Sequence, residues 1–257
     1  MFSELYKKCD NDYQSMSSSC CHRGAKPCDC YRCLREGFYE LADKYNCEKK
    51  MAFYVINYGA AFCNEFYYYL NTSNVLNNFI EKPIKILSLG CGFAPDYYAI
   101  EKYIADKNLQ INFSYIGYDC STHWNSQIDF LKNQRNNFHF EIRDLTDLEK
   151  PLSFADYDLV VMCKVFSTIY KHKKHELLLQ NIIDATNSMK KDAVFLFNDI
   201  NDKEMGRDKF DNAVSGFLVS SDARKYYTAG YTGNNWTLIQ QPHTIFKNVF
   251  FEYRKQI

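Results

Sequence analysis

Apolar and polar positions follow two different patterns along the chain, and the change falls near residue 83. Before it, apolar residues recur every three or four positions and predict helices over 31–45, 49–70 and 73–80. After it, short apolar runs alternate with helical patterns and predict strands at 84–89, 111–118, 138–142, 157–163 and 193–199. The chain therefore divides into a helical part over 1–82 and an α/β part over 83–257.

The second part predicts a mostly parallel sheet, because strands that are buried on both faces and joined by helices pair in this way. Pro95 suits the first turn of the helix after the first strand, and Ser121 is a candidate N-cap after the second. The segments 236–242 and 249–255 have no helix between them and predict an antiparallel pair at the sheet edge. The glycine-containing stretch 212–233 is expected to cover a site.

A glycine corner follows the first predicted strand. In "KILSLGCGFAP", Gly90 and Gly92 flank Cys91 and would allow a ligand to approach the backbone at the start of a helix. Asp119 ends the second strand, 29 residues after Gly90, where a carboxylate can accept hydrogen bonds from ribose hydroxyls. Asp144 follows the third strand and is placed to receive an adenine amino group. A tight turn without a ligand and a helix-capping Asp119 are the competing interpretations.

From Ile84 onward, the chain resembles the class I, Rossmann-type S-adenosylmethionine-dependent methyltransferases. "LSLGCGFAP" looks like their first motif, "YIGYDCS" like their ribose-binding motif and "IRDLTD" like their adenine-binding strand end. "DLVVMCKVFSTIY" is similar to their fourth strand, and the first motif further suggests a subgroup that reads Ser-Leu-Gly-x-Gly. The resemblance implies a doubly wound, mostly parallel, seven-stranded sheet. It also implies S-adenosylmethionine held by Gly90, Cys91, Gly92, Asp119, Asp144 and Cys163, with Trp124 near the adenine.

The chain departs from the family pattern at two positions of the first motif. Ser88 stands where many members carry an acid, which would weaken contact with the methionine amino group, and Ala94 replaces a third glycine. These departures keep open a different function, a zinc-containing interaction module on a catalytically inactive Rossmann scaffold. A nicotinamide-dependent oxidoreductase is disfavoured, because Pro95 occupies the last glycine position of its motif and the acid comes later than expected.

Methyl transfer depends mainly on positioning, and a base is needed only for some acceptors. The tips of the fourth and fifth strands offer Lys164 and Asp199 as candidate catalytic residues. Asp199 is equally consistent with a cap for the helix that follows it. The Asn/Asp-Pro-Pro-aromatic motif of DNA amino methyltransferases is replaced by "CKVF", and no Pro-Cys pair serves cytosine carbon-5 methylation, so both chemistries are disfavoured. The basic run 170–175 is a candidate phosphate contact or a solvated helix start.

The segment "CCHRGAKPCDCYRC" predicts a structural zinc site. Zinc takes four thiolate or imidazole ligands, and short Cys-x-x-Cys turns supply two of them. The candidates are Cys21, His22, Cys28, Cys30 and Cys33, with Cys9, Cys20 and Cys47 as substitutes. Reduced thiols in a disordered, Ser-rich start are the alternative, because intracellular cysteines seldom form disulfides.

Composition limits the partners. Basic and acidic residues number 31 each, so no overall charge attracts nucleic acid or a membrane. No signal peptide or long apolar run is apparent, and we expect a cytoplasmic protein without a membrane partner. The oligomeric state is left open.

Because a zinc-containing extension exceeds what a minimal methyltransferase needs, we expect an RNA or protein acceptor. RNA is favoured by the basic residues that interleave with Tyr31, and acidic residues that follow closely weaken that preference.

Overall fold

The computed structural model describes residues 2–17, 27–40, 45, 47–228 and 248–255, without the side chains of 36–40 and 219–228. Its helices are α1 Phe2–Ser15, α2 Cys30–Glu40, α3 Glu48–Tyr54, α4 Ala60–Ser73, α5 Pro95–Asp106, α6 Asn125–Lys132, α7 Phe166–Lys171, α8 His175–Thr186 and α9 Arg207–Val214. Short turns of other helix types are η1 Val55–Gly59, η2 Val75–Phe79, η3 Thr122–Trp124 and η4 Lys203–Met205. The strands are β1 Ile84–Leu89, β2 Phe113–Asp119, β3 Phe138–Ile142, β4 Leu159–Cys163, β5 Val194–Ile200, β6 Leu218–Thr228 and β7 Asn248–Lys255.

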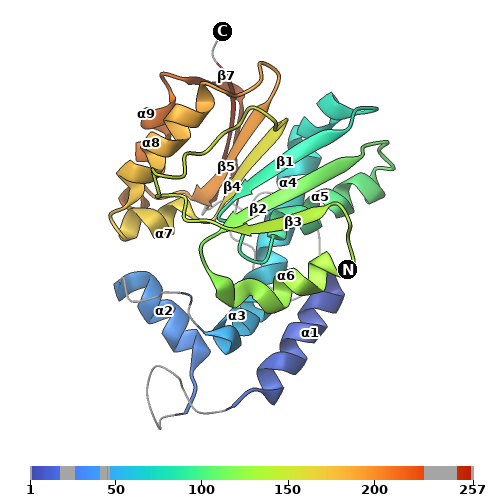
Figure 1. The fold of residues 1–257 in the computed structure, drawn as a ribbon, viewed down its shortest axis with the longest axis vertical. Coiled ribbons are helices and arrows are strands. Elements are labelled where there is room, and N and C mark those ends of the chain that lie inside the picture. Colours follow the sequence, from blue (N-terminus) through green and yellow to red (C-terminus); the bar gives the residue numbers. More distant parts are fainter. Residues whose placement is uncertain (1, 18–26, 41–44, 46, 229–247, 256–257) are drawn as a thin grey trace.

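One sheet organises the molecule, in the strand order β3-β2-β1-β4-β5-β7-β6 (Figure 1). The first five of these strands pair in parallel, and β7 is antiparallel to both β5 and β6. The mostly parallel α/β sheet is thereby confirmed. Every residue of β4 is buried, and in β1 only Lys85 is exposed. This burial is expected for strands covered by helices on both faces.

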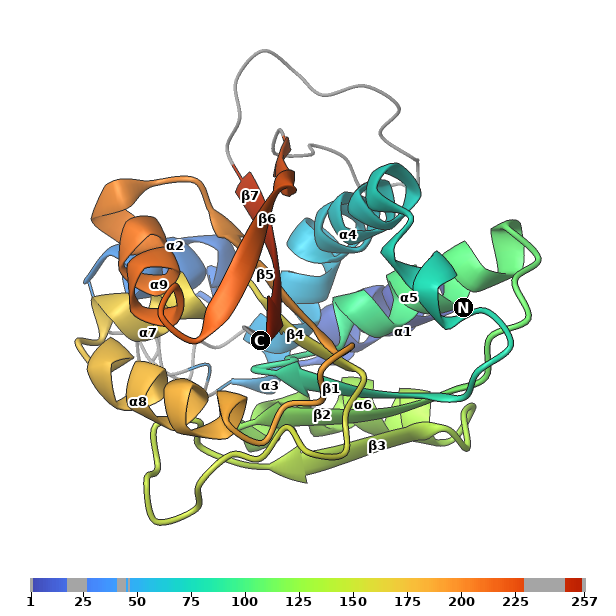
Figure 2. The same cartoon turned by 90° about the horizontal axis from the view of Figure 1, so that it is seen from above.

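The two faces of the sheet carry separate apolar clusters. Helices α4, α5 and α6 cover one face, and α7, α8 and α9 cover the other (Figure 2). The first cluster also contains Phe2, Leu5 and Cys9 of α1 and Met51 of α3. The helical part that precedes β1 therefore shares its core with one face of the sheet.

Helix α1 and strand β6 differ from the sequence expectations. The start of the chain is not an irregular Ser-rich segment, because Phe2, Leu5 and Cys9 form a buried stripe on α1. Residues 218–228, inside the stretch that was expected to cover a site, instead form β6, which pairs with β7. The predicted partner segment 236–242 lies outside the described residues.

Helices α3 and α4 continue one another through the π-helical turn η1. Gly59 ends this turn, and a Cβ atom there would lie only 2.8 Å from Cζ of Phe2. The absence of a side chain lets α1 cross the turn closely, which fixes the orientation of α4 over the sheet.

Within the described residues, no helix is both long and apolar enough to cross a membrane.

Candidate functional site

A cavity of about 360 Å³ opens at the carboxyl ends of β1, β2 and β4. Open parallel sheets bind ligands at this edge, where the strand order reverses around β1 and β4. All the predicted cofactor residues line the cavity, namely Gly90, Cys91, Gly92, Asp119, Asp144 and Cys163. Trp124 and Lys164 line it as well, so the tertiary structure brings together motifs that are more than 70 residues apart in the sequence.

The glycine corner requires its glycines for two different reasons. Gly90 has a φ of +68°, and a Cβ atom there would lie 2.4 Å from Cγ2 of Val165, a contact too short for any side chain. Gly92 has a φ of +54°, and its Cβ atom would meet the Trp124 ring at an ordinary 3.4 Å. Ala94 adopts a φ of +62° directly before Pro95, the first residue of α5. The position of the missing third glycine therefore keeps the left-handed backbone that glycine favours.

Asp119 connects the glycine corner to the loop after β2. One carboxylate oxygen accepts a hydrogen bond from the Gly92 amide at 2.9 Å, and the other accepts one from the Ser121 amide at 2.9 Å. Burial raises the pKa of Asp119, and these amides oppose the rise. Ser121 caps the η3 turn, as predicted, because its hydroxyl accepts from the His123 amide at 3.3 Å. The carboxylate thus fixes the local backbone while facing the cavity.

Asp144 presents one carboxylate oxygen to the cavity. Its Oδ1 accepts hydrogen bonds from the amide and the hydroxyl of Thr146 at 2.9 and 2.8 Å. Oδ2 has no hydrogen-bond partner among the described residues. This oxygen is available for an amino group of a ligand, the role that the sequence predicted for Asp144.

The two predicted cysteines of the site are buried thiols. Burial raises the pKa of Cys91 and of Cys163 well above the usual thiol value. Sγ of Cys91 occupies the space above Gly117 of β2, where an added Cβ atom would lie 2.5 Å from it. Sγ of Cys163 donates to Oδ1 of Asn198 at 3.1 Å. Both side chains therefore contribute to the floor of the cavity as neutral groups and not as nucleophilic thiolates.

Lys164 follows β4 with a φ of +60°, and its ammonium group forms a buried ion pair. Nζ lies 3.1 Å from Oε1 and 3.0 Å from Oε2 of Glu65, which belongs to α4. The side chains of Lys164 and Glu65 are 9% and 2% exposed. Asn198 donates to the same carboxylate at 3.2 Å. Sequence patterns did not reveal Glu65 as a partner of Lys164, because 99 residues separate the two positions.

Asp199 has a structural role that differs from both sequence interpretations. Its Oδ2 accepts a hydrogen bond from the Ser167 amide at 2.9 Å, in the first turn of α7, and its Oδ1 accepts from the Ile200 amide at 2.7 Å. The cap of the following η4 turn is Asp202, whose side chain accepts from the Glu204 amide. Asp199 is 2% exposed and does not line the cavity.

The helical extension supplies an aromatic wall of the cavity. Tyr54 and Phe62 line it, with their ring centroids 5.9 Å apart. Tyr54 also packs edge-on against Trp124 at 5.5 Å and against Phe93 at 6.4 Å. The helical spacing of these aromatic residues fits ordinary core positions equally well, because spacing alone does not say which face of a helix meets a cavity.

Ser88 of β1 and Asp96 of α5 are buried polar residues, and the Ser88 hydroxyl and Oδ2 of Asp96 have no hydrogen-bond partner among the described residues. Both residues are fully buried, and neither lines the cavity. The Tyr115 hydroxyl donates to Oδ1 of Asp96 at 2.9 Å. Burial raises the pKa of Asp96 to about 6, and the Ser88 and Tyr115 hydroxyls oppose the rise. The acid that the family pattern places at position 88 is therefore replaced by a serine with a carboxyl group close by.

The cysteine-rich segment is described only in part. Cys21 and His22 lie outside the described residues, whereas Cys28, Cys30 and Cys33 lie at the start of α2. Sγ of Cys28 and Sγ of Cys30 are 3.4 Å apart. Among the described residues, no group of three or more histidine, cysteine or acidic side chains is arranged to hold a metal ion.

Comparisons with known proteins identify the fold. No family model matches the chain, and no curated protein matches it by sequence. Among solved structures, the N-methyltransferase NodS from Bradyrhizobium japonicum, in complex with S-adenosyl-L-homocysteine, is 11% identical with a TM-score of 0.52. This likeness covers 89% of the chain and 99% of NodS. The fold is that of S-adenosylmethionine-dependent methyltransferases.

Two further solved structures share this fold. The plantazolicin methyltransferase BpumL is 16% identical with a TM-score of 0.52, over 88% of the chain and 96% of BpumL. A putative RNA methyltransferase from Pyrococcus horikoshii is 14% identical with a TM-score of 0.50, over 76% of the chain and 82% of that protein. These proteins carry the names of different kinds of methyltransferase, so the fold does not identify the acceptor.

Proposed function

We propose that the protein transfers a methyl group from S-adenosylmethionine to an acceptor. The observation that carries this proposal is the convergence of the glycine corner, Asp119 and Asp144 on one cavity. A carboxylate at the end of β2 suits a ribose, and the unpartnered Oδ2 of Asp144 suits an amino group. The positive φ values of Gly90 and Gly92 form the tight turn that presents the start of α5 to a ligand. The residues present therefore fit the cofactor that the fold implies.

In this proposal, the residues of the chain mainly position the reactants. S-adenosylmethionine supplies an activated methyl group when bound. Asp119 orients the ribose, Asp144 orients the adenine, and Cys163 and Lys164 border the position of the reacting groups at the tip of β4. The buried floor and the aromatic wall exclude water, which strengthens each polar contact. Asp199 is not assigned a catalytic role here, because its carboxylate is engaged with the start of α7.

Binding of S-adenosylhomocysteine, measured by calorimetry, tests the proposal. We expect one site per chain, and Asp119→Ala and Asp144→Ala are each expected to weaken binding by about tenfold or more, since each removes a charge-assisted hydrogen bond. The exposed Asp129 of α6 provides the matched control, Asp129→Ala, which should bind normally. Binding of NADH alone would favour an oxidoreductase. Binding of neither ligand would favour an interaction module on an inactive scaffold.

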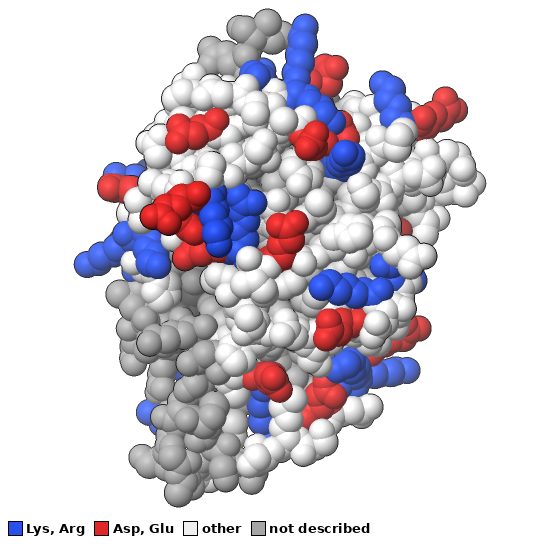
Figure 3. Space-filling model, viewed as in Figure 1, with Lys and Arg blue, Asp and Glu red and all other residues white. Residues whose placement is uncertain are grey.

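We further propose an RNA or protein acceptor, because the cysteine-rich helical extension exceeds what a minimal methyltransferase needs. The face seen in Figure 3 carries basic and acidic side chains interspersed, without a field of one sign. A labelled methyl group should appear in total RNA or total protein when these are offered with the enzyme. Label that enters only a small-metabolite extract would contradict a polymeric acceptor.

A structural zinc ion in the cysteine-rich segment is a separate proposal, supported by the contact between Cys28 and Cys30 and by the clustered cysteines of the sequence. Protein purified without added zinc should contain about one equivalent, and the double variant Cys30→Ser/Cys33→Ser should lose it. Cys120→Ser, an exposed cysteine at the cofactor cavity, is the control and should retain the metal. Metal-free protein with an unchanged melting temperature would remove this proposal.

A further inference from the structure

The inner end of the cavity, beside the tip of β4, has a side-chain chemistry of its own. Three neighbouring side chains line the cavity there: Tyr54 and Phe62 from the helical extension, and Lys164 from the end of β4. Nζ of Lys164 lies 5.7 Å from the centroid of the Phe62 ring. Tyr54 packs against Phe62 on one side and Trp124 on the other. This end of the cavity is therefore an aromatic slot with an ammonium group in its wall.

Lys164 is one of the charged residues that line the cavity, and its ammonium group lies over the Phe62 ring at this end. Glu65, its ion-pair partner, is 2% exposed and does not line the cavity, so the carboxylate lies behind the ammonium group. A lysine ammonium group has three N–H donors, and the two oxygens of Glu65 engage at most two of them. Lys164 thus keeps a donor for a ligand, and Glu65 holds that donor in place.

The Tyr54 hydroxyl provides a second donor at this end. No described residue forms a hydrogen bond with it, although the side chain lines the cavity. Burial raises the pKa of Tyr54 well above the usual phenol value, with smaller contributions from Tyr45, Tyr58, Cys163 and Asp199. The hydroxyl therefore remains protonated at neutral pH and is able to donate.

The carboxylates near this end are not free to act as a base or to bind a cation. Glu65 is engaged by Lys164 and Asn198, and Asp199 is engaged by the amides of Ser167 and Ile200. Neither carboxylate lines the cavity. The imidazole that does line it, His172, is exposed where α7 ends. Two donors without a free carboxylate suit an oxyanion and disfavour an ammonium group.

We propose that this end binds the methyl acceptor as an aromatic or planar oxyanion, a carboxylate or phenolate, with Lys164 and Tyr54 as its hydrogen-bond donors. The proposal rests on the proposed methyltransferase function, and of the two polymers named there it fits a protein, because RNA carries no carboxylate or phenolate. A lone pair of the acceptor oxygen forms the new O–CH₃ bond while the electrons of the S–CH₃ bond return to sulfur. The anion and the sulfonium cation give a neutral methyl ester or ether and a neutral thioether. No proton moves, so no base is required.

Benzoate is a suitable probe, because it combines a flat ring with a carboxylate. Calorimetric titration of benzoate into protein saturated with S-adenosylhomocysteine should show binding, and benzylamine, of similar size and opposite charge, should not bind. Tyr54→Phe should weaken benzoate binding by about three- to tenfold through the loss of one hydrogen bond. Tyr58→Phe is the matched control, since Tyr58 stacks on Phe62 at 5.9 Å without lining the cavity and should leave binding unchanged.

Lys164 is tested in a variant that leaves no unpaired buried charge. The double variant Lys164→Met/Glu65→Gln removes both charges of the ion pair and should abolish benzoate binding while circular dichroism shows a folded protein. Failure of S-adenosylhomocysteine itself to bind the unchanged protein would remove the proposed function. Normal S-adenosylhomocysteine binding without benzoate binding, or benzoate binding that survives the double variant, would overturn the acceptor inference alone.

The carboxylate of the cofactor is the other candidate anion for Lys164, and a second ligand separates the two. 5′-Methylthioadenosine lacks the amino-acid part of S-adenosylhomocysteine. We expect the double variant to bind both ligands as the unchanged protein does. A loss of about tenfold or more for S-adenosylhomocysteine, with 5′-methylthioadenosine unaffected, would assign Lys164 to the cofactor and overturn the inference.

Discussion

At the scale of single residues, the two glycines of the glycine corner differ in how well they tolerate an added side chain. Gly90→Ala and Gly92→Ala both place a side chain at positive φ, which costs roughly 1–2 kcal/mol. Only the first also brings its Cβ atom to 2.4 Å from Val165, and such overpacking costs about 1–3 kcal/mol more. Urea unfolding should therefore show a larger loss of stability for Gly90→Ala. Equal losses would mean that Val165 moves aside freely.

Asp96 gives the second prediction at this scale. Its folded-state pKa of about 6 exceeds that of an unfolded aspartate, so the folded protein holds this proton more tightly. The stabilisation is fully present below about pH 4 and is lost as the pH rises through 6. Relative to Asp96→Asn, the free energy of unfolding of the unchanged protein should fall by about 3 kcal/mol between pH 4 and 7. A shift of about two pKa units corresponds to that free energy.

Urea unfolding of both proteins across this pH range measures the difference, because the remaining titratable groups are common to the two. A constant difference between the two proteins would show that Asp96 has an ordinary pKa.

The residues that the sequence predicted follow from local patterns along the chain. Those that it missed depend on packing between distant parts of the chain. Gly90, Asp119 and Asp144 each follow a strand, and the parallel arrangement of strands brings such residues to one edge without further information. Phe62 lines the cavity, and Glu65 pairs with Lys164, only because α4 packs over the sheet, and helical periodicity does not specify that packing. Asp199 accepts a hydrogen bond from the Ser167 amide at the start of α7 and does not cap the helix that follows it, because a residue at a strand end can cap any helix that begins nearby.

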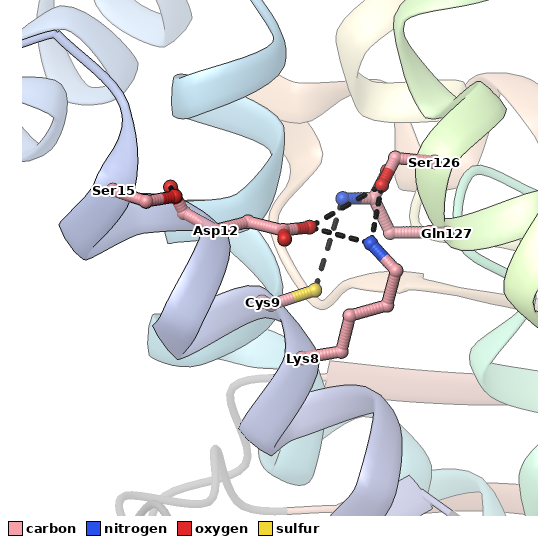
Figure 4. Close-up of polar contacts among 6 residues, drawn as sticks. All are labelled: Lys8, Cys9, Asp12, Ser15, Ser126 and Gln127. Atoms are coloured by element: carbon pink, nitrogen blue, oxygen red, sulfur yellow. Dashed lines mark hydrogen bonds and ion pairs between the residues drawn. The ribbon is translucent and has the colours of Figure 1, made fainter.

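At the scale of elements, α1 combines an ion pair within the helix, polar contacts to α6 and a buried apolar stripe. Lys8 forms an ion pair with Asp12 at 2.5 Å and donates to the Ser126 hydroxyl of α6 at 2.6 Å, and Gln127 donates to Sγ of Cys9 at 3.7 Å (Figure 4). The side chains of Lys8 and Asp12 remain about 30% exposed. Partly exposed ion pairs contribute at most about 1 kcal/mol. The buried stripe that contains Leu5 is therefore the main attachment of the helix.

Two substitutions on α1 test this order of contributions. Leu5→Ala should destabilise the protein by about 2–5 kcal/mol, because Leu5 is fully buried and its removal leaves a cavity. Lys8→Ala, one turn away, should cost less than about 1 kcal/mol. Thermal or urea unfolding of both variants gives the comparison. A larger loss for Lys8→Ala would show that the polar cluster, and not the apolar stripe, attaches α1.

The same reasoning explains which elements were predictable. The strands β1 to β5 were found within two residues of their bounds, because each is a compact apolar run between polar turns. Helix α1 was missed, because only three buried residues mark its inner face among polar neighbours. Strand β6 was missed, because glycine, serine and aspartate in and before it indicate turns, and only its pairing with β7 makes it a strand.

At the scale of the whole molecule, the helical part and the α/β part depend on each other. Phe66 and Leu70 of α4 belong to the same buried cluster as Tyr97 and Ile100 of α5 and as Phe250 of β7. Phe250 stacks on Tyr69 of α4 with ring centroids 4.3 Å apart, and the Tyr69 hydroxyl donates to Glu252 at 2.7 Å. Removal of residues 1–82 would expose this face of the sheet to water and leave the buried Glu252 without that donor.

We therefore expect that a chain of residues 83–257 does not fold into a stable methyltransferase domain. It should lack a cooperative thermal transition and should bind a dye for exposed apolar surface, because the apolar burial that stabilises one face is missing. The full chain is the control. Supplying residues 1–82 as a separate chain should restore cooperative unfolding if the contacts, and not the covalent connection, are what the sheet requires. Cooperative unfolding of 83–257 alone would show that the extension is a dispensable addition, and the aromatic wall with Tyr54 would then be a later elaboration of a complete fold.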